Sequence, residues 1–86
     1  MIVTKQVVAE QIAAHLKHRV TLLQLVDWAE NAMMDGEFDE KDAATISAVV
    51  ARLGVSDVRA FGLTWTDCEE LLAKLGFSAR VEIVAA

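Results

Sequence analysis

Proline is absent from this 86-residue sequence, glycine occurs only four times, and Cys68 is the single cysteine. Without proline and with little glycine, the chain favours continuous helices and lacks the composition of a long linker or a disordered tail. One cysteine cannot form an internal disulfide, so the simplest setting is a reducing cytoplasm. At this length we expect a single helical domain over residues 1–86.

Long hydrophobic runs are also missing, although 55% of the residues are hydrophobic and the mean hydropathy is +0.37. No apolar run approaches the ~18–20 residues of a membrane-spanning helix, and no basic segment followed by an apolar one begins the chain. The apolar residues therefore belong in a dense core or at a subunit interface. Because a domain of this size buries only about 60% of its unfolded surface, we expect a homodimer and no membrane association.

Apolar residues recur with a helical period in four segments. These predict helices over residues 5–18, 22–35, 40–53 and 67–75. Thr4 and Asp39 are the expected N-caps of the first and third helices, and the pairs Thr21–Gln24 and Thr66–Glu69 have capping-box spacing. A glycine follows each of the last three predicted helices, and we expect the one at Gly36 to adopt the left-handed conformation.

After the fourth predicted helix the period changes to two. From residue 77 to residue 83, apolar and polar side chains alternate, which predicts a C-terminal strand. A lone strand is not stable in water, so it must pair with the β-inclined residues 1–3 or with the same strand of a second copy. The predicted fold class is therefore mainly α, a compact bundle of four helices with a short C-terminal strand.

The closing segment LLAKLGFSARVEIV, residues 71–84, resembles the helix-to-strand ending of some small bacterial antitoxins. This resemblance, which covers only that segment, implies a small protein that acts by binding a partner protein.

The second predicted helix carries more apolar residues than one face can hold. One broad face contains Leu22, Leu25, Val26, Ala29, Ala32 and Met33. Leu23, Trp28 and Met34 lie off that face, and we expect them at the dimer interface. The alternative is that they are single exposed apolar residues, which are common on soluble proteins.

The acids are concentrated in one part of the chain. Residues 27–42 hold seven acids and one base, a net charge of −6, and the remainder holds six acids and seven bases, giving the total of −5. Such a field repels nucleic acid and favours a basic protein partner. The predicted partner-binding residues are Asp35, Glu37, Asp39, Glu40 and Asp42.

Two other interpretations of this acidic segment remain open. One is a solvated turn with a helix cap. The other is a weak ion site, because Asp35, Glu37 and Asp39 alternate like the start of a calcium loop. That loop requires a glycine where Glu40 stands and a closing glutamate where Ile46 stands, so the calcium pattern is incomplete.

His15 and His18 lie three residues apart on the first predicted helix, a spacing at which both imidazoles could reach one metal ion. No further ligand motif lies nearby. The alternative is a half-buried His15 within the apolar stripe and a surface His18, and we assign no metal or cofactor.

Catalytic motifs are not found. Cys68 follows a helix start, which lowers a thiol pKa, but it also shares an apolar face with Leu71 and Leu72, so a buried structural cysteine is favoured. A helix-turn-helix interpretation of the first two helices fails because the second is acidic. The sequence predicts a non-enzymatic protein-interaction module of antitoxin, immunity-protein or inhibitor type. The alternative is an accessory subunit that binds a metal or ligand through His15 and His18.

Overall fold

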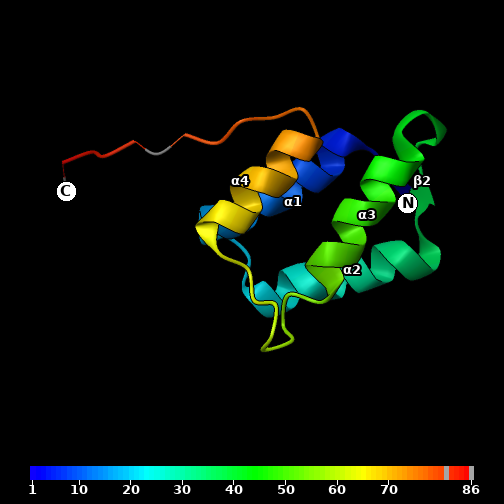
Figure 1. Cartoon of the computed structure of the whole chain (residues 1–86), viewed down its shortest axis with the longest axis horizontal. Coiled ribbons are helices and arrows are strands. Elements are labelled where there is room, and N and C mark those ends of the chain that lie inside the picture. The colour runs from blue at the N-terminus through cyan, green and yellow to red at the C-terminus, as the bar shows by residue number, and fades with distance from the viewer. Residues whose placement is uncertain (81, 86) are drawn as a thin grey trace.

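The structure is a computed structural model that describes residues 1–80 and 82–85. Its elements, in chain order, are β1 (Ile2–Val3), α1 (Lys5–Leu16), α2 (Leu22–Asp35), β2 (Glu37–Phe38), the short 3-10 helix η1 (Glu40–Asp42), α3 (Ala43–Gly54) and α4 (Trp65–Lys74). The four α-helices pack as one body, and the C-terminal segment extends away from it (Figure 1). The predicted fold class, mainly α with four helices and a small strand element, is confirmed.

The core lies between all four helices, and its largest helix contact is between α2 and α3. On α2 the inward positions include Ala29 and Ala32, both fully buried, and side chains this small allow α3 to approach closely. The other helices contribute buried side chains from one face each, among them Val8 and Ile12 of α1, Ile46, Val49, Val50 and Leu53 of α3, and Leu71 and Leu72 of α4. No helix in the described part of the chain combines the length and apolar character needed to cross a membrane.

Side-chain caps fix where the helices begin. The Thr4 hydroxyl accepts the Val7 N–H at 3.1 Å, as predicted. The predicted capping box of α2 is confirmed: the Thr21 hydroxyl accepts the Gln24 N–H at 3.1 Å, and the Gln24 side chain accepts the Thr21 N–H at 2.8 Å. α2 begins at Leu22 and ends at Asp35, which are the predicted bounds.

The start of α4 differs from the prediction. Its capping box is formed by Thr64 and Asp67, not by Thr66 and Glu69, so the helix begins at Trp65. The sequence offers two overlapping boxes two residues apart. The first is also supported from α3, where Nη2 of Arg52 lies 3.4 Å from Oδ2 of Asp67.

The end of the first predicted helix and the start of the third also differ from the prediction. The first helix ends at Leu16, before residue 18, because His18 adopts a left-handed φ of 61°. The predicted third helix is divided into η1 and α3, with Asp39 capping η1 through its contact with the Lys41 N–H at 3.2 Å.

Gly36 is not left-handed, and that prediction was wrong. Its φ of −79° and ψ of 147° are extended, so the chain leaves α2 directly into β2. The position needs glycine for lack of space, because a Cβ there would meet the Ala32 carbonyl oxygen and lie 2.9 Å from Cγ2 of Val3.

The small sheet joins the N-terminus to the segment after α2. β1 and β2 are parallel, with Ile2 opposite Glu37 and Val3 opposite Phe38. The Glu37 N–H donates to the Met1 carbonyl at 2.8 Å, and the Asp39 N–H donates to the Val3 carbonyl at 3.0 Å. The N-terminal residues therefore pair with β2. The predicted alternative in which they pair with the tail is wrong.

The predicted C-terminal strand is not formed in the described tail. Residues 77–80 and 82–85 have no strand assignment, and residue 81 of that prediction lies outside the described residues. The pairing is long-range: residues 1–3, the partner expected within the chain, pair with β2, and the described tail is not part of that sheet.

Candidate interaction site

The predicted acidic residues form a continuous surface segment, here called the acidic turn, over residues 35–42. It comprises the last residue of α2, Gly36, β2, Asp39 and η1. Asp35, Glu37 and Glu40 are exposed, whereas Asp39 and Asp42 are half-buried. Because the amides of Glu37 and Asp39 are bonded to carbonyl groups of residues 1–3, the backbone at these two acids is anchored to the N-terminal residues.

The five predicted acids fall into two groups. Asp39 caps η1, and Oδ1 of Asp42 lies 3.7 Å from the Lys5 ammonium nitrogen, so both have local structural partners. The side chains of Asp35, Glu37 and Glu40 make no hydrogen bond or salt bridge to any described residue. These three carboxylates are therefore the part of the acidic turn that is available to a partner.

Two methionines lie next to these carboxylates. Met33 and Met34, in the last turn of α2, are 51% and 74% exposed. Met33 shares the broad apolar face of the predicted helix but is not buried with it, because the buried α2 face ends with Ala29 and Ala32. Methionine is flexible and polarizable, so an exposed pair can adapt to varied apolar partners. The acidic turn thus has an apolar border at its start.

The predicted dimer-interface residues differ in how exposed they are. Leu23 is 65% exposed, whereas Trp28 is half-buried and packs against the core. Leu23 and Met34 lie about 16 Å apart along α2, from a rise of about 1.5 Å per residue, and the exposed acids Asp27 and Glu30 share their stripe. The outer face of α2 is therefore a mixed surface and not a continuous apolar patch.

The two histidines are not assembled into a metal centre. His15 is half-buried, and its Nδ1 lies 3.3 Å from the Val20 carbonyl oxygen. His18 is exposed beyond the end of α1. Among the residues that the structure describes, no group of three metal-ligating side chains comes together.

Cys68 is buried in the core at 1% exposure. Burial raises the pKa of its thiol, the adjacent Asp67 carboxylate raises that pKa further, and Arg52 opposes both. The protonated thiol is therefore favoured, and the side chain packs as a small apolar group.

Arg52 organises the connection between α3 and α4, which the sequence pattern did not reveal. Its guanidinium donates to the Ser56 hydroxyl at 3.1 Å and to the Gly62 carbonyl at 3.1 Å. The same group lies 5.5 Å from the centre of the Phe61 ring. Together with its Asp67 contact, these bonds tie the loop between α3 and α4 to both helices.

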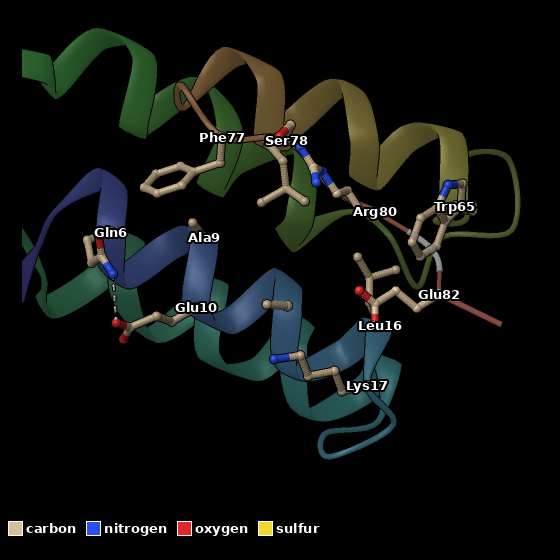
Figure 2. A pocket seen from close by; sticks show the side chains of 13 residues that line it. Gln6, Ala9, Glu10, Leu16, Lys17, Trp65, Phe77, Ser78, Arg80 and Glu82 are labelled. Carbon is tan, nitrogen blue, oxygen red and sulfur yellow. Dashed lines mark hydrogen bonds between the residues drawn. The ribbon is translucent and has the colours of Figure 1, made fainter. Parts of the chain in front are cut away.

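A groove between α1 and α4 has a volume of about 510 Å³. Ala9 and Leu16 line it from α1, and Trp65 lines it from α4 (Figure 2). Leu72 of α4 is also part of the lining. Residues 77–80 and Glu82 of the tail form a further wall. No sequence pattern indicates this groove, since it depends on how α1, α4 and the tail meet.

Comparison with protein-family models, with curated proteins and with solved structures found no significant match to this chain.

Proposed function

We propose that the chain is a non-enzymatic protein-binding module, of antitoxin, immunity-protein or small-inhibitor type, that docks a basic partner on its acidic turn. The observation that carries this proposal is the group of three carboxylates without described partners, Asp35, Glu37 and Glu40, on a backbone anchored to β1. Anchoring matters because preorganised groups lose less conformational entropy on binding than mobile ones.

The partner should present basic side chains beside an apolar group. Lysine or arginine would face Glu37 and Glu40, and the apolar group would contact Met33 and Met34. Complementary charge of this kind mainly accelerates association and fixes orientation. The proposal places the protein in the cytoplasm, because its single cysteine is a buried free thiol.

The experiment begins by capturing binding proteins from the native host and then measures association and dissociation rates over a range of salt concentrations. The double variant Glu37→Lys/Glu40→Lys should slow association roughly tenfold or more and flatten its salt dependence. Asp39 is left unchanged because it caps η1.

Glu69→Lys/Glu70→Lys is the matched control, since it makes the same change in charge at two exposed positions of α4. Circular dichroism should show the same helix content for both variants. If the two double variants slow association equally, net charge and not the acidic turn governs binding, and the proposal fails.

A further inference from the structure

The described part of the C-terminal tail, which begins at residue 77, contacts the helices at its start but not towards its end. At its start, the Phe77 N–H donates to the Leu72 carbonyl at 2.9 Å, and Ala79 packs against the core. Towards its end, Ile83 and Val84 are 97% and 77% exposed. Among the described residues, no backbone hydrogen bond involves residues 78–80 or 82–85. The tail thus combines exposed apolar side chains with backbone groups that can pair with another strand.

The groove between α1 and α4 lies beneath this tail. Its apolar lining includes Leu16, Leu72 and Trp65, and the Trp65 side chain remains 40% exposed. Figure 2 shows Phe77 towards one end of the groove and Glu82 near Trp65 at the other. The chain has therefore run the length of the groove before it reaches Ile83 and Val84.

The protein's own Ile83 and Val84 cannot readily return to the groove. Doing so would require the chain to reverse direction after Glu82. Residues 77–86, FSARVEIVAA, contain no glycine, proline, asparagine or aspartate, the residues that form tight turns most readily. A segment of another chain could enter the groove without such a reversal.

We propose that the groove receives the tail of a second copy of this protein. The two tails pair antiparallel, in the register that places Arg80 opposite Glu82 of the second copy. Two-fold symmetry then creates the same pair twice, so each interface contains two cross-strand ion pairs. The tail sequence is complementary to itself in this antiparallel register, whereas parallel in-register pairing would place like charges together.

The same register delivers apolar side chains to the groove. Ala79 falls opposite Ile83 of the second copy, and directly opposite residues project from the same face of a strand pair. Because Ala79 packs against the core, Ile83 of the second copy faces the helices. A two-stranded ribbon alone is marginal in water, and packing on α1 and α4 supplies the cover that it needs.

Sedimentation velocity over micromolar concentrations tests this arrangement on the full chain and its charge variants. The wild-type protein should form a dimer of twice 9.4 kDa. Arg80→Glu and Glu82→Arg should each raise the dimer dissociation constant roughly tenfold or more, because each places like charges opposite one another. An equimolar mixture of the two variants should recover wild-type affinity as a heterodimer, since both cross-strand pairs are then of opposite charge.

Lys74→Glu is the control, because it makes the Arg80→Glu change in charge at an exposed position on α4 outside the groove lining. It should leave the dissociation constant unchanged, and circular dichroism should give all variants the same helix content. A wild-type monomer throughout, a dimer insensitive to Arg80→Glu, or a mixture that fails to recover affinity would each overturn the proposal. Binding of the basic partner is a separate measurement and does not enter this result.

Discussion

Among the four glycines of the chain, Gly36 has the least space for an added methyl group. A Cβ there meets the Ala32 carbonyl oxygen and comes within 2.9 Å of Cγ2 of Val3, so α2 and β1 cannot both keep their places. We expect Gly36→Ala to lower the free energy of unfolding by about 1–3 kcal/mol, as overpacking does elsewhere.

Gly54→Ala is the matched control for that substitution. Gly54 is the last residue of α3, and nothing lies within 4 Å of the position that an alanine methyl group would take there. Alanine favours helices over glycine, so this variant should be neutral or slightly more stable. Urea denaturation of both variants decides the matter, and equal midpoints would mean that the space around Gly36 is not limiting.

Arg52 is the second residue on which the fold depends strongly. Arg52→Ala removes the bonds to Ser56, Gly62 and Asp67 and leaves the buried Ser56 hydroxyl without its donor. We expect a loss of about 1–3 kcal/mol in unfolding free energy. Arg52→Lys should recover only part of it, because an ammonium group cannot reproduce the planar set of donors. Arg59→Ala, at an exposed loop position, is the control and should change the midpoint of urea denaturation little. Full recovery of stability by Arg52→Lys would contradict this set of hydrogen bonds.

At the scale of elements, the start of α4 should make stability depend on pH. Hydrogen bonds from Thr64 lower the pKa of Asp67, and Arg52 lowers it further. A carboxyl whose folded pKa lies below its unfolded value stabilises the fold above the unfolded pKa, and that contribution is lost as pH falls through the folded pKa. Stability should therefore decrease as pH drops below 3.8, the ordinary pKa of an aspartate side chain.

Asp67→Asn should remove this part of the acid dependence. Denaturation midpoints from pH 6 down to acid, on the order of pH 2–3, should fall less steeply for Asp67→Asn than for the wild type. Asp57→Asn, which changes an exposed loop carboxylate without a described hydrogen-bond partner, is the control. Parallel curves for the wild type and Asp67→Asn would show that the α4 cap does not couple to protonation.

The elements also show what the sequence could and could not predict. The start of α2 was predictable because its capping box is local and agrees with the apolar period. Its end at Asp35 was predicted from Gly36, although this glycine is extended and not left-handed. The start of α4 was not, because two boxes overlap and a contact from Arg52 supports one of them. The tail strand was predicted wrongly for a similar reason: the N-terminal residues expected to pair with it pair with β2, which is distant in sequence from both.

The candidate site was also predictable only in part. The acids of the acidic turn are contiguous in sequence, so their clustering needed no knowledge of the fold. Which of them are engaged did need it, since Asp42 pairs with Lys5 from α1. The exposure of Met33 and the groove beside α4 depend on which helix covers which, and periodicity alone does not specify that.

At the scale of the whole molecule, the two proposed surfaces are separate. The acidic turn lies where β1, β2 and η1 meet, and the groove lies between α1 and α4 beneath the tail. A basic partner on the first surface and a second copy on the second would therefore use different residues, and one protein could hold both at once.

Amide hydrogen exchange with and without the captured partner tests the central claim most directly. Because the Glu37 and Asp39 amides are bonded to the carbonyl groups of Met1 and Val3, they should exchange slowly in the isolated protein. Partner binding should slow exchange further across residues 33–42 and leave α4 unchanged. Protection confined to α4 or the tail, with residues 33–42 unaffected, would contradict the assignment of the acidic turn as the binding surface.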